Sequence, residues 1–177
     1  MNNTELFIIP DEEIKLIGVQ NQIYGCPTVN GLKKLKNSIE LIQSQSNIDY
    51  IYAIDLGCGD GKIINYMNKY LSNNEWIGIE LSKSRINLAD NLDNIIEGNL
   101  LDLSYKNFNF IYVNNLCFDD ELNEKLENKI YYEFNGFILA SNQISSSKLL
   151  NIIDFVKIIN IDMNWQRDYP LNLYKKF

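Results

Sequence analysis

Apolar residues in this chain recur with two spacings, one typical of strands and one typical of helices. Residues 51–56 form a short apolar run, and the apolar residues after position 62 share one helical face (Ile63, Ile64, Met67, Tyr70 and Leu71). The strand-then-helix order repeats, because further apolar runs occupy residues 77–80, 94–98, 108–113 and 136–140. Ser82 and Asp119 each stand where a helix N-cap is expected.

The two ends of the chain follow different patterns. Residues 155–161 and 171–175 are alternately or continuously apolar without a helix between them, which predicts an antiparallel hairpin at one edge of a sheet. Thr28 can cap a helix over residues 29–43. Residues 6–9 fit either an edge strand or an N-terminal arm, followed by an acidic turn. The whole pattern predicts an α/β fold with a mostly parallel sheet, helices on both faces and a C-terminal antiparallel hairpin.

The first predicted strand runs into a glycine-rich turn, Asp55-Leu-Gly57-Cys-Gly59-Asp-Gly61. A strand, a glycine turn and a helix aim backbone N–H groups and the positive helix end at a ligand. Asp55 adds a carboxylate that can accept hydrogen bonds from a ligand amine. A nicotinamide-binding turn would read G-x-G-x-x-G, but here Lys62 takes the last position. The order D-x-G-x-G-x-G instead resembles the S-adenosylmethionine-binding loop of class I methyltransferases.

A second acid stands in register with this loop. Glu80 ends the second predicted strand, about 20 residues after the glycines, where an acid accepts hydrogen bonds from ribose hydroxyls in Rossmann-like folds. Taken singly, the glycines could be an ordinary strand–helix turn and Glu80 a solvated strand end. Together they predict a nucleotide-type cofactor site. The resemblance implies S-adenosylmethionine as cofactor and a Rossmann-like sheet of seven strands.

Composition limits the classes of protein that the chain can be. Its 177 residues suffice for one domain with its own core. We expect residues 1–47 to form an N-terminal arm, a cofactor-covering loop and a helix, and residues 48–177 to form the Rossmann-like core. The chain has no histidine, which excludes histidine-based triads and histidine-ligated metals, and no metal site is predicted.

Charge and cysteine content bear on partners and compartment. A net charge of −7 argues against stable nucleic-acid binding and suits a basic protein partner. The three cysteines include no C-x-x-C pair, which fits reduced thiols. No apolar run reaches transmembrane length, and the first residues lack the features of a signal peptide. We therefore expect an intracellular protein, cytoplasmic or nuclear, without a membrane partner.

The residues just past the first four strands gather the candidate chemistry. Ligands of such sheets bind beyond the carboxyl ends of the strands, which here are followed by residues 57–61, Glu80, residues 98–100 and residues 114–115. Asn99 and Leu100 stand where methyltransferases hold adenine. Asp102 competes with Asn99 for that role, and Asn99 could also be a plain turn residue.

The fourth strand ends in a more specific motif. Amino-methylating enzymes that act on DNA or glutamine show Asn or Asp followed by Pro-Pro-Tyr here, whereas this chain has Asn114-Asn-Leu-Cys-Phe118. Residues 110–118, the acidic helix after them and residues 136–141 resemble the disruptor-of-telomeric-silencing (DOT) family of histone lysine methyltransferases. Tyr24-Gly25 with Thr28 and a long helix resembles that family's cofactor-covering loop, and Trp165 fits its aromatic lysine channel.

The resemblance implies a set of cofactor-binding residues: Tyr24, Thr28, Asp55, Gly57, Cys58, Gly59, Glu80, Leu81, Asn99, Leu100 and Asn114. The chain departs from the family at Cys26, where the loop has an acid, and at Asn99, which replaces an Asp. It also lacks the long basic segment that binds nucleosomes. A protein lysine, not necessarily in a histone, is therefore the predicted acceptor.

The predicted reaction transfers a methyl group from S-adenosylmethionine to a lysine amine. An amine attacks only when deprotonated, and a narrow apolar channel lowers its pKa by desolvation. Phe118, Trp165 and Tyr174 are the channel candidates, and Asn114 can bond the cofactor or the amine. Two alternatives stay open: an RNA or small-molecule acceptor, and a methyltransferase-like fold that serves as a non-catalytic binding subunit.

Overall fold

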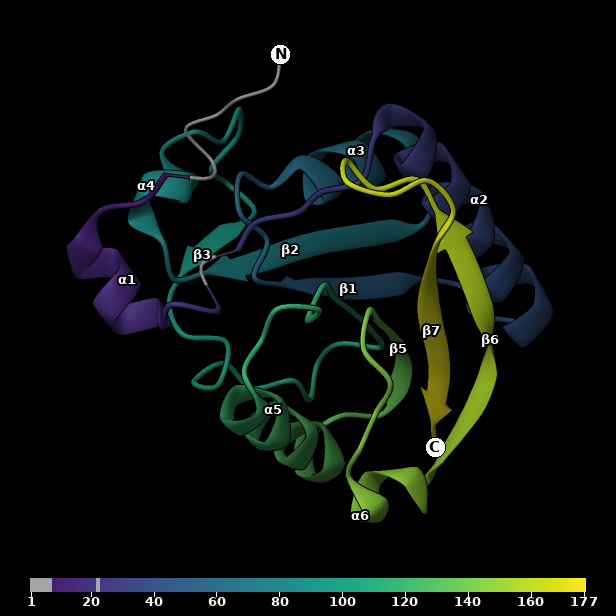
Figure 1. Cartoon of the computed structure of the whole chain (residues 1–177). Coiled ribbons are helices and arrows are strands. Elements are labelled where there is room, and N and C mark those ends of the chain that lie inside the picture. Colours follow the sequence, from purple (N-terminus) through teal and green to yellow (C-terminus); the bar gives the residue numbers. More distant parts are fainter. Residues whose placement is uncertain (1–7, 22) are drawn as a thin grey trace.

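The computed structural model describes residues 8–21 and 23–177, which form a seven-stranded sheet with the order β3-β2-β1-β4-β5-β7-β6 (Figure 1). The strands are β1 (Ile51–Leu56), β2 (Asn74–Glu80), β3 (Ile95–Glu97), β4 (Phe110–Val113), β5 (Gly136–Ala140), β6 (Ile153–Ile161) and β7 (Tyr169–Lys176). Strands β1 to β5 pair in parallel, whereas β7 is antiparallel to both β5 and β6. The α/β fold, its mostly parallel sheet and its C-terminal antiparallel hairpin are confirmed.

The helices are α1 (Asp11–Ile17), α2 (Val29–Ser46), α3 (Lys62–Tyr70), α4 (Lys83–Ile86), α5 (Asp120–Glu133) and α6 (Ser147–Leu150). The three predicted N-caps are confirmed, because Thr28, Ser82 and Asp119 each accept a hydrogen bond from a backbone N–H in the first turn. Each cap therefore fixes the residue at which its helix begins.

Two apolar cores lie on opposite faces of the sheet. One joins Leu35 and Ile39 of α2 with Met67 of α3, and the other joins Leu126 and Ile130 of α5 with side chains of β4 and β5. Figure 1 shows α2 and α3 on one side of the sheet and α5 and α6 on the other. Tyr70 departs from the predicted apolar face of α3, since half of its side chain (50%) is exposed at the helix end.

The N-terminal segment differs most from the sequence prediction. Residues 6 and 7 lie outside the described residues, and residues 8–10 have no regular structure. The expected acidic turn is the helix α1, whose first turn carries Asp11, Glu12 and Glu13. Acidic side chains in the first turn stabilise a helix because they interact favourably with its positive N-terminal end. Residue ranges 8–21 and 23–177 contain neither a helix suited to crossing a membrane nor a cluster of potential metal ligands.

Candidate active site

Three cavities meet beyond the carboxyl ends of β1, β2 and β4. All three are lined by Tyr24, Gly25 and Asn114, so these residues mark the junction. One cavity runs toward β2 and β3, a second reaches under the glycine loop, and a third opens between Leu116 and Trp165. The position agrees with the rule that ligands bind at strand carboxyl ends in open α/β sheets.

The first cavity, of about 160 Å³, collects most of the predicted cofactor-binding residues. Its walls include Gly57 after β1, Glu80 and Leu81 at the end of β2, and Asn99 with Leu100 after β3. Asn99 lines the cavity and also closes a turn, because its Oδ1 accepts from Leu101 N–H at 2.9 Å. Asp102 is not among the described lining residues, which favours Asn99 over it.

Glu80 is held in a fixed position although it is a charged side chain with only 5% exposure. Its two carboxylate oxygens accept from the backbone N–H of Gly59 at 2.9 Å and of Ser82 at 2.8 Å. A carboxylate has about four lone-pair positions, so further acceptor capacity remains for ligand hydroxyl groups. The side chain therefore ties the glycine loop to the end of β2 and still offers an acceptor.

The second cavity is small, about 20 Å³, and its lining combines charged and apolar side chains. Asp55, Cys58, Lys62 and Tyr112 line it beside the junction residues. Burial, followed by the nearby charges of Glu80 and Asp60, raises the pKa of the Asp55 carboxyl well above its ordinary value. The buried Tyr112 hydroxyl has no hydrogen-bond partner within the described chain. A buried acid and an unpaired hydroxyl suit a ligand that brings its own charged groups.

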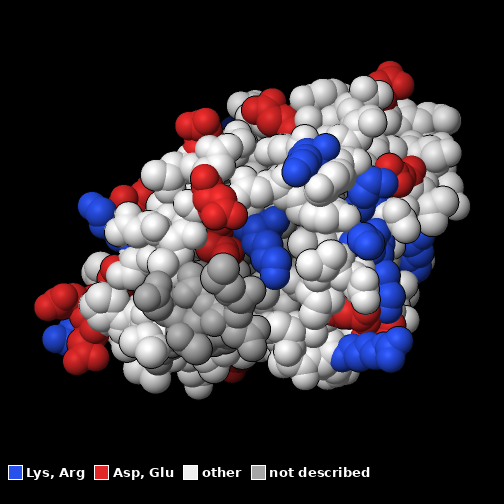
Figure 2. Space-filling view, turned by 90° about the horizontal axis from the view of Figure 1, so that it is seen from above, with Lys and Arg blue, Asp and Glu red and all other residues white. Residues whose placement is uncertain are grey.

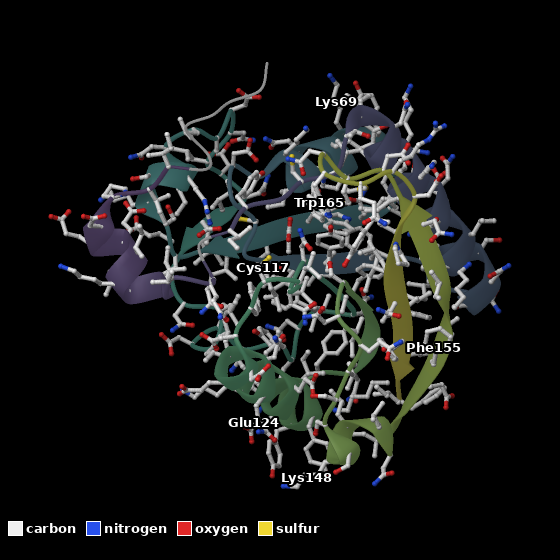
Figure 3. The ribbon with its side chains drawn as sticks, in the orientation of Figure 1. Lys69, Cys117, Glu124, Lys148, Phe155 and Trp165 are labelled. Carbon is white, nitrogen blue, oxygen red and sulfur yellow. The ribbon has the colours of Figure 1, made fainter. Side chains whose placement is uncertain are left out.

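The third cavity, of about 250 Å³, is an apolar slot whose described lining residues are all uncharged. Besides the junction residues they are Ile23, Leu116, Cys117, Asn164 and Trp165. Trp165 comes from the loop between β6 and β7, and Cys117 from the segment after β4 (Figure 3). The slot thus gives an apolar route from the protein surface to the junction.

The segment 23–28, here called the covering loop, is fastened to the β6–β7 loop by backbone hydrogen bonds. Thr28 N–H donates to Asp162 O at 2.8 Å, and Asn164 N–H donates to Cys26 O at 2.9 Å. Trp165 then packs on Gly25, where an added Cβ would lie 2.0 Å from its ring. Only glycine fits at position 25 while the tryptophan keeps this place.

Tyr24 lies on the glycine loop itself. An added Cβ on Gly59, whose φ is +58°, would lie 2.2 Å from the Tyr24 ring. The Tyr24 hydroxyl donates to Asp60 Oδ1 at 2.8 Å, and the Arg85 guanidinium lies 5.3 Å from the ring centre. Helix α1 is attached nearby, because Glu13 accepts hydrogen bonds from both Ser82 and Ser84. Hydrogen bonds therefore join Tyr24 of the covering loop to the glycine loop, and Glu13 of α1 to the residues that follow β2.

Four predicted site residues lie elsewhere than expected. Gly59 lies under the Tyr24 ring and is not among the described lining residues of the three cavities. Phe118 lines the first cavity instead of the slot. Thr28 caps α2 and donates to Asp162 O, and it is not among the described lining residues. Tyr174 is 4% exposed within the core beside α5 and α6, where its hydroxyl accepts from Ile144 N–H at 3.3 Å. Thr28 and Tyr174 therefore do not contact these cavities.

Sequence reasoning missed most of the slot. Leu116 and Cys117 directly follow the Asn-Asn pair, so that motif was a usable signal. Ile23 and Asn164 come from distant loops, and no local pattern could have joined them. Arg85, which is buried against Tyr24, was also missed.

Comparison with known proteins shows which solved structures have a similar fold. No family model matches the chain, and no curated protein matches it in sequence. Among solved structures, magnesium protoporphyrin IX methyltransferase (ChlM) from Synechocystis PCC 6803, solved with bound SAM, is 12% identical with a TM-score of 0.54 over 81% of this chain and 78% of that chain. The Methanococcus maripaludis protein mmp1179, described as an S-adenosylmethionine-dependent methyltransferase, is 14% identical with a TM-score of 0.56 over 84% and 87%.

A third solved structure has a similar fold. The plantazolicin methyltransferase BpumL, solved with a triazolic desmethylPZN analog and SAH, is 21% identical with a TM-score of 0.53. The match covers 82% of this chain and 62% of BpumL, so the chain spans less than two thirds of that enzyme. Identities this low establish the fold alone. The chain has the Rossmann-like fold of class I S-adenosylmethionine-dependent methyltransferases.

Proposed function

We propose that this protein is an S-adenosylmethionine-dependent methyltransferase whose acceptor is the ε-amine of a protein lysine. The observation that carries the proposal is the junction of three chemically different cavities at Tyr24, Gly25 and Asn114. S-adenosylmethionine has a nucleoside, a charged amino-acid end and a sulfonium methyl group. The first cavity can hold the nucleoside, the small cavity with Asp55 and Lys62 can hold the charged end, and the apolar slot can bring an acceptor to the methyl group at the junction.

The side chains fit such a cofactor. Glu80 can accept from the ribose hydroxyls, and Leu81, Asn99 and Leu100 can surround adenine. Asp55 can hold the ammonium group, and Lys62 together with the unpaired Tyr112 hydroxyl can hold the carboxylate. When bound, the cofactor supplies an electrophilic methyl group. Binding would also compensate the buried polar groups of the small cavity.

The slot supports an amine carried on an apolar stem. Its uncharged lining, including Trp165, removes water from the entering group, which lowers the pKa of an amine by disfavouring its charged form. The lysine side chain is a charged tip on an apolar stem. Asn114 lies where the slot meets the junction and can bond the amine. No imidazole base is needed for attack by an amine that enters already deprotonated.

Surface charge supports a basic protein as partner. The chain has a net charge of −7. Two lysines of α2 are already engaged, Lys34 with Asp162 and Lys36 with Glu40. In the view from above, acidic side chains predominate on the left half of this face, whereas most lysine and arginine side chains lie on the right half (Figure 2). An acidic protein attracts lysine-rich protein in preference to RNA.

A small-molecule acceptor is the second candidate, and the apolar slot is the observation that favours it. A volume of about 250 Å³ whose described lining residues are uncharged could also hold a compact apolar compound. ChlM is a porphyrin methyltransferase, so the fold itself accommodates such acceptors.

The test is a transfer assay with S-adenosylmethionine labelled in its methyl group. The protein is offered a lysine-rich protein, total RNA and a small-molecule fraction in separate reactions, with the Glu80→Ala variant as control. We expect protease-sensitive label on lysine that depends on Glu80. Label released by ribonuclease, or confined to small molecules, would overturn the acceptor. Absence of label in all three would overturn the methyltransferase activity.

A further inference from the structure

We propose that Ser141 is a positioning residue for methyl transfer that acts through the side chain of Asn114, an inference that rests on the proposed function. The Ser141 hydroxyl donates to Asn114 Oδ1 at 2.6 Å. The Asn114 Nδ2 group in turn donates to Gly25 O at 3.1 Å. One series of hydrogen bonds thus connects the ends of β5 and β4 with the covering loop at the cavity junction.

The two partners allow only one orientation of the Asn114 amide. The Gly25 carbonyl oxygen can accept but cannot donate, so it must face the Nδ2 group. The Oδ1 atom then faces Ser141, whose hydroxyl is the donor. Without that hydroxyl, nothing in this pair of contacts would hold the oxygen side of the amide in place.

Ser141 is itself fixed by the sheet. It is 6% exposed. Its backbone N–H donates to Val113 O at 3.2 Å, and its carbonyl accepts from Asn172 Nδ2, also at 3.2 Å. The hydroxyl therefore projects from a rigid element toward a group at the junction, as a positioning residue requires.

The orientation has a chemical consequence. After its bond to Ser141, Asn114 Oδ1 keeps a second lone pair. That lone pair can accept an N–H of the incoming neutral amine, which turns the amine lone pair toward the junction. A reversed amide would present N–H groups to N–H groups. Misplacement of reacting groups by about 1 Å can cost about 10²-fold in rate.

The first measurements compare single variants of the full chain. We expect Ser141→Ala to lower kcat by roughly 10- to 100-fold, with the dissociation constant of S-adenosylmethionine changed less than about twofold because Ser141 does not line the cofactor cavity. Ser141→Thr keeps the hydroxyl and should retain most of kcat. Ser141→Cys donates weakly and should give an intermediate value. The matched control is Ser38→Ala, which removes a hydroxyl bonded to Lys34 O at 2.9 Å on α2 and should leave kcat unchanged.

The deciding experiment is a double-mutant cycle with Asn114→Ala. If Ser141 acts through Asn114, Ser141→Ala causes no further loss of kcat in the Asn114→Ala background. If Ser141→Ala lowers kcat by the same factor with and without Asn114→Ala, its effect does not act through Asn114. That result would overturn the positioning role of Ser141 but not the proposed function. If the unaltered protein transfers no label to any acceptor, the proposed function itself is wrong and the inference is overturned with it.

Discussion

Asn114 and Asn115 are adjacent, yet the structure gives them different surroundings. Asn114 lies at the cavity junction and contacts the covering loop. Asn115 is 6% exposed on the other side of the strand end, where it bonds Asn123 and Asn142. The first is placed to contact ligands, and the second connects α5 with the segment after β5. The motif predicted from sequence thus contains one candidate catalytic residue and one structural residue.

We expect Asn114→Ala to reduce turnover by roughly 10- to 1000-fold, because the reacting groups lose a fixed partner. Its stability should fall by about 1 kcal/mol, because the side chain gives up its hydrogen bonds with Ser141 and Gly25. Asn115→Ala is the control: it should lower stability by about 1–3 kcal/mol, because this buried side chain loses its hydrogen bonds with Asn123 and Asn142, while turnover of the folded protein is retained. Denaturant unfolding and initial rates measure the two effects. Unaltered turnover of folded Asn114→Ala would contradict the role.

Asp55 should make the stability of the ligand-free protein depend on pH. Burial raises its pKa above the ordinary value of 3.8, so the folded state binds more protons than the unfolded state. Stability therefore falls as the pH rises from about the unfolded pKa toward the raised folded pKa, and stays lowered above it. Asp55→Asn should remove this dependence on pH. The Tm of the variant minus the Tm of the unaltered protein should therefore increase from pH 4 to pH 8. A pH-independent Tm difference would contradict the prediction. The same change should weaken cofactor binding.

At the scale of elements, the covering loop and the β6–β7 loop form one wall of the slot although they lie far apart in sequence. Their backbones are joined at Pro27 and Met163, which form an isolated antiparallel bridge. Lys34 of α2 holds the β6–β7 loop through ion pairs with Asp162 and Asp168. The position of Trp165 therefore depends on Gly25, α2 and the hairpin together.

Gly25→Ala should break this wall, because its Cβ would lie 2.0 Å from the Trp165 ring. We expect a higher KM for the acceptor and a red shift of tryptophan emission. The other tryptophan, Trp76, is fully buried and should report no change. Adding Trp165→Ala makes room for the Cβ, so hydrogen-exchange protection of residues 23–28 should recover while the acceptor KM stays high. Unchanged emission and KM in Gly25→Ala would contradict this packing.

The sequence predicted the strands and the capped helices well because their signals are local. The bounds of β1 and β5, and the caps at Thr28, Ser82 and Asp119, follow from apolar runs and polar residues beside them. The short helices α1 and α6 were not predicted. Helices of this length are marginal alone, and here tertiary contacts support them: Glu13 bonds Ser84, and Glu127 accepts from Ser146 N–H.

The cofactor side of the candidate site was predictable for the same reason, whereas most of the slot was not. Glu80 ends β2, Gly57, Asn99 and Asn114 come just after strands, and parallel strands bring their ends together. The slot was predicted only through Trp165, because its other walls depend on how two remote loops pair. Tyr174 was wrongly placed near it, since side chains of a strand alternate between faces and this one points to the α5 side of the sheet.

For the whole molecule, net charge should govern the encounter with a basic acceptor. The charge of −7 attracts lysine-rich protein over distances that salt shortens, from about 10 Å at 0.1 M to about 3 Å at 1 M. We expect kcat/KM for a lysine-rich acceptor to fall as salt rises. A peptide with one lysine among neutral residues is the control and should respond weakly. Equal salt dependence for both acceptors would argue against electrostatic selection.

Calorimetric titration with S-adenosylmethionine decides whether the cavity beside Glu80 is a cofactor site. We expect binding to the unaltered protein and a loss of about 1–3 kcal/mol in Glu80→Ala, because charge-assisted hydrogen bonds disappear. Glu97→Ala is the matched control, since Glu97 is the register partner of Glu80 at the end of β3 and is exposed; its affinity should equal that of the unaltered protein. Binding of NAD in place of S-adenosylmethionine, or binding that is unaffected by Glu80→Ala, would contradict the assignment.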